Sequence, residues 1–461
     1  MTPLRLLSAV KSISGLVFTS ADITLQVSRV TLASLCLSLS SGAFASSAAL
    51  SHDKMDAIAD EFVQVGLRFQ NHDPLPYLYI GPEAWRTKAR EDDMSLAEVL
   101  AALNDLNHRI QALPPTTDEQ DLRRRRDLTA RLVALQTRGN ILQGIYPKDF
   151  DDETLKQFGT IAPRYQEAQF LEWVAELDAL LPGEAPLTER VAALRDQFMI
   201  PQNKIKDVIG RAMQECRSRS NAKIKLPANE SVTLNITNNM PWVGFTEYKG
   251  DSQSIVHLNA SVPVHIERAI ELGCHEGYPG HHVHATLVEQ EFVKNRGWNE
   301  YTYIPLVGPL AVIAEGAASF AMDIAFSREE RMAFERDVLF PMAGLDDEKL
   351  DTYYHYIDLV EKLNYARNEA ARQYLYQGMT RDDAKRWLMK FGLETEGTAA
   401  TRMNIIDAQR SYVITYNYGR TLVADYIHNK TPLGTPAAWD YFSNILTTPL
   451  SPQDILIKDA N

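Results

Sequence analysis

The segment from Glu271 to His284, with the sequence ELGCHEGYPGHHVH, constrains this chain more than any other stretch. Within it, three histidines and a glutamate lie between His275 and His282, inside an apolar pattern with helical spacing. Proteins rarely concentrate neutral nitrogen ligands and a carboxylate in this way, and the commonest reason is a zinc ion. The segment therefore predicts a helix that binds a metal.

The spacing of the histidines departs from that of the ordinary zinc-protease helix. That helix carries His-Glu-x-x-His, whose histidines lie on one face, four residues apart, and reach one metal at ~2.1 Å. Here the run HEGYPGH holds two more residues, so a continuous helix would put His275 and His281 ~9 Å apart along its axis and about 240° apart around it. Pro279 cannot donate to the carbonyl of His275, and Gly280 can adopt conformations closed to other residues. We predict that this pair bulges the helix and brings His281 back to His275.

His282 is the alternative second ligand. On a straight helix it returns to the angular position of His275, but it lies ~10 Å along the axis, too far to share one ion without distortion. His281 restores the usual register, so we assign His281 to the metal and give His282 a supporting or substrate-contacting position. Glu276 adjoins the first ligand and is the predicted general base, which takes a proton from the metal-activated water.

The run HEGYPGHH at residues 275–282 resembles the His-Glu-x-x-Pro-Gly-His-His signature of the bacterial family called domain of unknown function 885. That family is mostly helical and is regarded as a set of zinc metallopeptidases. Its members carry Glu-Gly-Trp-Ala on a later helix, and the glutamate of that motif is the expected third ligand. This chain has AEGAA at residues 314–318, with Ala317 in place of the tryptophan. The resemblance therefore implies one zinc ion bound by His275, His281 and Glu315.

A second motif of the family lies near the C-terminus. Its Tyr-x-x-Gly matches Tyr416 to Gly419, which makes Tyr416 the best candidate to stabilise the oxyanion that develops during hydrolysis. Arg410 and Tyr412 are alternatives one turn earlier, where the family has Pro-Gly-Gln. Tyr412 and Tyr416 are equally compatible with packed aromatic residues, and Arg410 is equally compatible with a surface arginine. The resemblance covers residues 230–427, and its departures bear on substrate preference rather than on the ligands.

A structural zinc site is a competing interpretation, but closed sites of that kind favour cysteines. The chain has three cysteines, and Cys36 belongs to the predicted leader. Cys216 and Cys274 remain, which do not make a closed ligand set. An oxidising compartment would allow a disulfide between them, and two buried thiols are the alternative.

The N-terminus is typical of a secretory leader. Arg29 precedes the apolar run VTLASLCLSL at residues 30–39, and Ala43-Phe44-Ala45 forms a small-x-small cleavage site. We predict a signal peptide over residues 1–45 and a mature chain in the periplasm or outside a bacterial cell. No later apolar stretch is long enough to cross a bilayer, so no span is expected in the mature chain.

The charge of the chain argues against nucleic acid as its main partner. Its 461 residues carry a net charge of −13, whereas phosphate binding needs a basic face. The dense basic run from Arg123 to Arg126 lies in a charged helical pattern and predicts a solvated face. A peptide or a small amide is the expected substrate.

Hydrophobic periodicity predicts a mainly α fold. In the N-terminal half, residues 46–225, apolar residues recur at helical spacing over about 94–112, 117–143, 162–182 and 187–215. The period changes to two near residue 230, and the runs 245–248 and 254–258 predict a hairpin. Helices return after residue 262. We therefore predict one large helical domain, 46–461, whose second half, 226–461, adds a small antiparallel β hairpin or sheet beside the metal-binding helix.

The predicted hairpin has two interpretations of equal weight. Zinc peptidases commonly place an edge strand before the metal helix, and an extended substrate can add to it as another strand. Residues 254–260 would then present backbone groups to a peptide, with Asn259 near the site. Alternatively, the hairpin only covers the helical core. His257 alternates with apolar neighbours and is expected on the solvent side of its strand, not as a ligand.

These patterns together predict an exported zinc-dependent hydrolase, most directly a peptidase. Two alternatives remain: a zinc-dependent amidase or hydrolase of a non-peptide bond, and an inactive relative that binds peptides. The presence of Glu276 beside the predicted ligands argues against inactivity, because a binding protein has no need of a general base.

Overall fold

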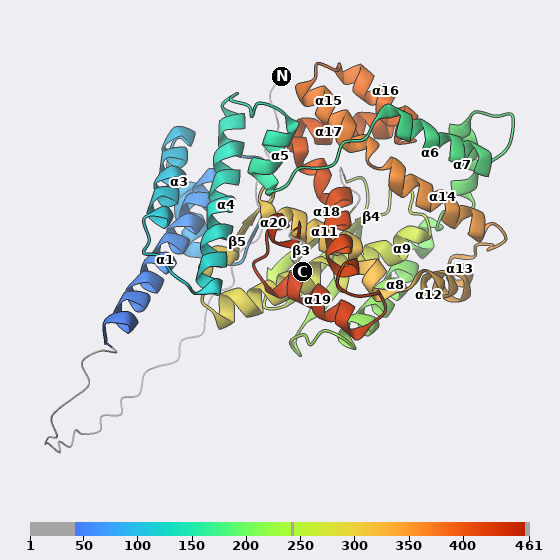
Figure 1. Cartoon of the computed structure of the whole chain (residues 1–461). Helices are drawn as coiled ribbons and strands as arrows, with labels where there is room; N and C mark the ends of the chain where they lie inside the picture. Colours follow the sequence, from blue (N-terminus) through green and yellow to red (C-terminus); the bar gives the residue numbers. More distant parts are fainter. Residues whose placement is uncertain (1–41, 241–243, 457–461) are drawn as a thin grey trace, which may run out of the picture. The chain divides into compact units, whose positions relative to one another are not determined.

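The computed structural model describes residues 42–240 and 244–456, with side chains from Asp53 onward. The described chain is mainly helical and contains one two-stranded and one three-stranded sheet (Figure 1), which confirms the predicted fold class. The predicted leader, residues 1–45, lies outside the described residues except for its last positions, which begin the first helix. Contacts divide the chain after Ala48, and all the sites described below belong to the unit Ala49–Asn461.

The N-terminal half is built from helices that begin at clear capping residues. Ser95 and Glu98 form a capping box at the start of α3, and Asp118 caps α4. The elements are α1 (Gly42–Phe69), β1 (Tyr77–Tyr79), α2 (Glu83–Glu91), α3 (Leu96–Gln111), α4 (Glu119–Leu142), α5 (Phe150–Phe158), α6 (Glu167–Leu180), α7 (Leu187–Asp196), η1 (Gln202–Lys204) and α8 (Ile205–Asn221). The predicted helix over 187–215 is wrong in one respect. It is interrupted before Pro201, where Met199 forms a β-bridge with His265.

The basic run on α4 is not the uniform solvated face that the sequence predicts. Arg124 is 1% exposed and pairs with the buried carboxylate of Glu300 at 2.6 Å, as well as with Asp56. A guanidinium can be buried in this way because two carboxylates and a fixed fork of donors offset its loss of water. The arginine therefore joins α4 to the segment before β5 (Tyr303–Pro305), which pairs with β1 in the two-stranded sheet.

The three-stranded sheet has the order β2-β4-β3 and lies before the metal-binding segment in the sequence. Its strands are β2 (Ser231–Thr237), β3 (Gly244–Gly250) and β4 (Gln253–Asn259). The predicted hairpin is confirmed, because β3 and β4 pair antiparallel. However, β2 pairs parallel with the other side of β4, so the sheet is mixed rather than antiparallel. The hypothesis that residues 254–260 form an open edge is therefore wrong, since β4 is hydrogen-bonded on both sides.

The C-terminal half returns to helices and short helical turns. Its elements are α9 (Glu267–Leu272), η2 (Gly273–Gly277), α10 (His281–Val288), η3 (Glu289–Asn295), η4 (Asn299–Thr302), β5, α11 (Pro309–Ala325), α12 (Arg328–Phe334), η5 (Glu335–Leu339), α13 (Phe340–Ala343), α14 (Leu350–Leu363), α15 (Ala366–Tyr376), α16 (Arg381–Phe391), α17 (Glu396–Gln409), η6 (Arg410–Val413), α18 (Ile414–His428), α19 (Pro436–Thr447) and α20 (Pro452–Leu456). Among the described residues, no single helix is long and apolar enough to cross a bilayer. The helix α11 and the segment Arg328–Ala343 reach that length and apolar character only together, as a pair bent by 78°.

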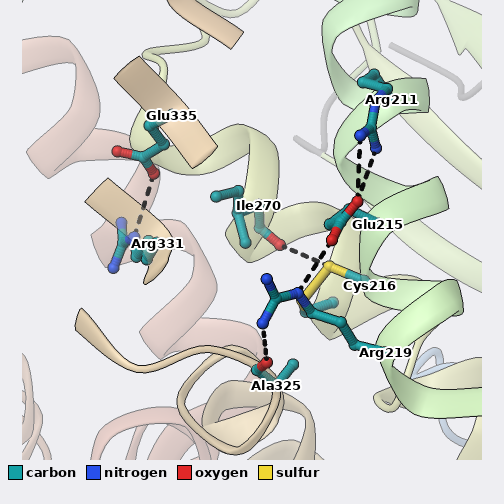
Figure 2. Close-up of a disulfide and its surroundings, with 9 residues drawn as sticks. Arg211, Glu215, Cys216, Arg219, Ile270, Ala325, Arg331 and Glu335 are labelled. Atoms are coloured by element: carbon teal, nitrogen blue, oxygen red, sulfur yellow. Dashed lines mark hydrogen bonds and ion pairs between the residues drawn. A yellow bond between two sulfur atoms is a disulfide. The ribbon is translucent and has the colours of Figure 1, made fainter. Parts of the chain in front are cut away.

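A disulfide joins α8 to the turn that carries the first predicted ligand. Cys216 on α8 and Cys274 on η2 are bonded, with their Cα atoms 5.4 Å apart and a sequence separation of 58 (Figure 2). The alternative of two buried thiols is therefore not what the structure contains. Next to the bridge, Gly273 lies so close to α8 that an added Cβ would be 2.8 Å from the backbone nitrogen of Met213. The bridge and this close approach fix η2 against α8.

Helices α11 and α18 cross at two glycines, and this crossing places Glu315 beside the tyrosines of the C-terminal motif. A Cβ on Gly316 would overlap the carbonyl of Gly419, and a Cβ on Gly419 would be 2.8 Å from the carbonyl oxygen of Val312. Only a residue without a side chain allows backbones to approach this closely. The Glu-Gly and Tyr-x-x-Gly motifs are thus two sides of one helix contact.

We expect Gly316→Ala to destabilise the protein by at least ~1–3 kcal/mol, because the methyl group must push two helices apart. Chemical denaturation would measure this as a lower midpoint. Gly210→Ala on α8 is the matched control, since nothing lies within 4 Å of a Cβ there. Replacement of a helical glycine in open space by alanine should raise the free energy of unfolding by about 0.5–1 kcal/mol. Equal stability of the two variants would contradict a tight crossing.

Candidate metal centre

The Pro-Gly interruption folds the metal-binding segment back on itself. The helix α9 continues into the π-helical turn η2, which ends at Gly277, and a new helix, α10, begins at His281. Between them, the amide of Gly280 donates to the carbonyl of Cys274 at 2.9 Å. A Cβ on Gly280 would overlap the carbonyl oxygens of Cys274 and His275, so only glycine fits there. The predicted bulge is confirmed.

This fold brings three side chains to one point. Ligand atoms of His275, His281 and Glu315 all lie within 4.8 Å of one another. The two imidazole rings have centroids 4.7 Å apart and stand at 89° to each other. The Nε2 atom of each ring is 3.6 Å from Oε2 of Glu315, and the side chains are 12–23% exposed. The three residues thus surround a small volume that solvent can still reach.

The carboxylate of Glu315 carries the clearest sign that this volume is built for a cation. Its Oε1 accepts a hydrogen bond from the hydroxyl of Tyr412 at 2.8 Å. Its Oε2 is buried and has no hydrogen-bond partner, since 3.6 Å to either histidine nitrogen is too long. A buried, unsatisfied carboxylate oxygen is costly. Two imidazole nitrogens and one carboxylate oxygen are a ligand set that catalytic zinc uses, so the donor chemistry fits that ion.

Without a metal ion, the Glu315 carboxylate keeps a proton on His281. Burial disfavours the charged imidazolium of His281, but the Glu315 carboxylate outweighs this effect and raises the pKa of His281 to about 9. Burial also disfavours the ionised form of Glu315, yet the positive charge of His281 and the contact with His275 hold the pKa of Glu315 well below its usual range. The metal-free site is therefore an ion pair at neutral pH.

We expect zinc binding at pH 7 to release at least about one proton per ion, because a metal ligand must be a neutral imidazole. The sign follows from the raised pKa: His281 is charged below pH 9, so zinc competes with protons there. Affinity should increase by about tenfold per pH unit from pH 7 until it levels near pH 9. Calorimetry in buffers with different ionisation enthalpies would count the protons. Binding with no proton release would contradict this account of the site.

Glu276 lies next to this centre and is held by the sheet. Its side chain is 6% exposed. The hydroxyl of Thr246 on β3 lies 2.6 Å from Oε2 of Glu276 and 2.8 Å from its backbone carbonyl oxygen. One carboxylate oxygen is thus oriented by a neutral donor, and the other makes no hydrogen bond among the described residues. Thr246 carries no sequence signal for this role, because nothing local distinguishes it from other strand residues.

His282 faces away from the centre, into a buried polar network. Its two ring nitrogens contact Oγ of Ser254 at 2.8 Å and Oε2 of Glu230 at 3.1 Å, and burial lowers its pKa. Glu230 also accepts from the hydroxyl of Tyr278 at 2.5 Å and from Arg217. His282 is fully buried, so it supports the bulge and does not contact substrate. The Ser-His-Glu order is that of a serine hydrolase, but Ser254 is only 3% exposed and no substrate could reach it.

Tyr412 contacts the candidate centre, and Tyr416 of the C-terminal motif lies beside Tyr412. Tyr412 bonds Glu315, and its ring packs edge-on against that of Tyr416, with centroids 5.8 Å apart. Tyr416 is 45% exposed, so part of its side chain is open to solvent. Desolvation and the charges of Glu315 and Glu276 raise the pKa of Tyr416 above its usual value. Its hydroxyl therefore stays protonated and can donate a hydrogen bond.

Two other predicted residues are engaged elsewhere. The guanidinium of Arg410 pairs with Glu153, a fully buried carboxylate, at 2.8 Å, so the predicted role of Arg410 at the oxyanion gains no support. Asn259 donates to the carbonyl of Met240 and accepts from the amide of Ser261, which orders the ends of the strands. Neither contact is to the three ligands. His257 lies on β4 and contacts Glu247 on the neighbouring strand.

Three solved structures resemble this chain at low sequence identity. No protein-family model and no curated protein matches the chain. A proposed lipoprotein of Colwellia psychrerythraea is similar at 14% identity over 78% of this chain and 68% of that one, with a TM-score of 0.49. A proposed lipoprotein of unknown function from Shewanella oneidensis is similar at 11% identity over 81% and 75%, with a TM-score of 0.43. An M32 carboxypeptidase of Deinococcus radiodurans is similar at 13% identity over 87% and 90%, with a TM-score of 0.41.

Proposed function

We propose that this protein is an exported zinc-dependent hydrolase, most directly a peptidase, with zinc bound by His275, His281 and Glu315. The observation that carries the proposal is the buried Oε2 of Glu315, which has no hydrogen-bond partner and faces two imidazole nitrogens. The resemblance of the HEGYPGHH run to domain of unknown function 885 supports the same ligands. When bound there, zinc would supply Lewis acidity toward a water molecule and a substrate carbonyl.

The residues around the ligands would divide the remaining work. Glu276 takes the proton from the attacking water and returns it to the leaving nitrogen, because its carboxylate adjoins the first ligand and is oriented by Thr246. Tyr416 donates to the carbonyl oxygen as negative charge develops there. Tyr412 fixes Glu315 through its hydroxyl and so orients a ligand rather than the substrate.

An extended substrate would pass along β3 rather than β4. The sheet order makes β3 an edge strand, and Thr246 on this strand is hydrogen-bonded to Glu276. A peptide that adds to an exposed edge gains main-chain hydrogen bonds over several residues. The strand that would pair with a substrate is therefore Gly244–Gly250, and not residues 254–260 as the sequence predicts.

We expect Tyr416→Phe to lower kcat by ~10²–10³-fold, because the variant loses one donor to the oxyanion and keeps the ring. Zinc content and the unfolding midpoint should stay at wild-type values, since Tyr412 and not Tyr416 touches Glu315. Tyr418→Phe is a suitable control on the same helix, with its hydroxyl 3.4 Å from Thr160. Unchanged turnover in Tyr416→Phe would exclude the role.

Cleavage of a mixed peptide library tests the function directly. We expect zinc-loaded protein to cleave peptides, a chelator to stop cleavage, and added zinc to restore it. A zinc-loaded protein that cleaves no peptide but hydrolyses small amides would favour the non-peptide hydrolase. Peptide binding with no hydrolysis of either would favour the inactive relative.

Export is the second part of the proposal. A small-x-small site at Ala45 would release a chain that begins at Ser46, and the bonded pair Cys216 and Cys274 suits an oxidising compartment. N-terminal sequencing of the protein recovered from a periplasmic extract would test this. A chain recovered only from the cytoplasm with its leader intact would reject it.

A further inference from the structure

A small pocket adjoins the candidate metal centre on the side of the C-terminal motif. Its lining includes Tyr412 and Tyr416, Arg367 from α15, Arg402 from α17, and Arg410. Tyr412 connects the pocket to the centre, because its hydroxyl bonds Glu315. Charges of both the metal centre and the pocket act on Tyr416: Glu315 and Glu276 raise its pKa, and Arg402 lowers it. The pocket and the candidate metal centre are thus connected through Tyr412.

Two of the three arginines that line this pocket share a single carboxylate, and the third, Arg410, pairs with Glu153. The Nε atoms of Arg367 and Arg402 lie 3.0 Å and 3.4 Å from the same oxygen, Oε1 of Glu394. The other oxygen of Glu394 is buried without a hydrogen-bond partner, so it neutralises no further cation. Among the described residues, neither guanidinium makes another ion pair or hydrogen bond. Two positive charges therefore face one negative charge.

The outer nitrogens of these guanidiniums remain available to a ligand. Both arginine side chains are 29% exposed, whereas Glu394 is 6% exposed. Burial and the neighbouring charge of Arg402 lower the pKa of Arg367 to about 10, in spite of the Glu394 carboxylate. Because the two guanidiniums repel one another, a bound anion would stabilise their charged forms.

We propose that this pocket binds a carboxylate of the substrate through Arg367 and Arg402, and so selects anionic peptides for hydrolysis. The proposal rests on the proposed hydrolytic function and names its substrate class. Guanidiniums recognise carboxylates through paired, charge-assisted hydrogen bonds, which are the stronger kind in water-poor sites. The carboxylate is either the C-terminus of a peptide or the side chain of an aspartate or glutamate. The former would make the enzyme trim peptides from their C-terminal end.

Three forms of one cleaved peptide separate these sources. The first has a free C-terminus and no acidic side chain, the second has an amidated C-terminus and a glutamate as its last residue, and the third is the same amide with glutamine. We expect the third form to have a kcat/KM about 10- to 100-fold lower than the preferred anionic form, mainly through KM. Preference for the first form assigns the C-terminal carboxylate, and preference for the second assigns the side chain. Equal cleavage of all three forms would overturn the proposal.

Variants of the arginines link this preference to the pocket. Arg402→Gln and Arg367→Gln should each remove most of the difference in kcat/KM between the anionic and neutral peptides. Each single variant leaves one arginine to pair with Glu394, so the buried carboxylate keeps a cation. Arg402→Lys should retain part of the preference, since charge is kept but the fork is lost. Arg386→Gln, an exposed arginine paired with Asp383 outside the pocket, is the matched control. An unchanged preference in both pocket variants would contradict the assignment.

A binding measurement keeps the pocket testable even if no peptide is cleaved. Calorimetry would compare the zinc-loaded full chain with benzoylglycine and with its amide. We expect benzoylglycine to bind about 10-fold or more tightly than the amide, and this difference to disappear in Arg402→Gln. Since any contact between the carboxylate and zinc is the same in every variant, a difference that survives in both arginine variants would overturn the pocket. Selective binding without cleavage would reject the hydrolytic function alone.

Discussion

Glu276→Gln should abolish most turnover while the protein keeps its metal. A positioned general base contributes ~10²–10⁴-fold to a hydrolytic rate, and glutamine has almost the same shape but cannot accept a proton. Thr246 can still donate to the remaining amide oxygen, so the side chain should stay in place. Zinc content and the unfolding midpoint should match the wild type. Steady-state kinetics on a cleaved peptide, with elemental analysis of the same sample, would measure both.

The control for this variant is Glu271→Gln. That glutamate lies in the helix before the bulge, is 32% exposed and pairs with Arg268 instead of Thr246. Its loss should change kcat by less than about threefold, because exposed ion pairs contribute little. A Glu276→Gln protein that loses zinc together with activity would show that Glu276 holds the site together, and would withdraw its role as the base.

His281→Ala should lose zinc, whereas His282→Ala should keep it. Loss of a residue that only orients a ligand weakens metal affinity by ~10–100-fold, so loss of a ligand should cost more than ~100-fold. His281 is assigned because its Nε2 lies 3.6 Å from Oε2 of Glu315, while both nitrogens of His282 contact Ser254 and Glu230. Zinc titration of the metal-free proteins would compare the affinities.

Both histidine variants should also be less stable than the wild type. His282→Ala leaves the buried carboxylate of Glu230 short of one donor, and should lower the free energy of unfolding by ~1–3 kcal/mol. His281→Ala removes the cation that pairs with the buried Glu315 in the metal-free protein, and should lower the free energy of unfolding by a comparable amount. His257→Ala, on the strand, is the control for the removal of an imidazole as such. Full zinc content in His281→Ala would reject the proposed ligand set.

The local order of residues is enough to predict the chemistry of the site. A proline and a glycine between His275 and His281 forbid a regular helix, because one lacks an amide donor and the other fits where a Cβ would collide with two carbonyls. The bulge could therefore be predicted from seven residues. The mainly α class and the β3–β4 hairpin were equally readable, since both depend on periodicities within a few turns or pleats. Glu315 was reached through the family resemblance, not from spacing.

Long-range packing sets which distant groups meet at the site. Thr246 orients Glu276 from 30 residues away, and Glu230 holds His282 from 52 residues away. Arg410 pairs with Glu153 across 257 residues, which no local pattern of either segment indicates. The sheet order β2-β4-β3 makes β3, and not β4, the edge strand beside Glu276. This order depends on the parallel pairing of β2 with β4, two strands that are not consecutive in the chain. Backbone preferences act over a few residues, whereas these contacts exist because helices and strands far apart in sequence bury one another's surfaces, and that packing is a property of the whole chain.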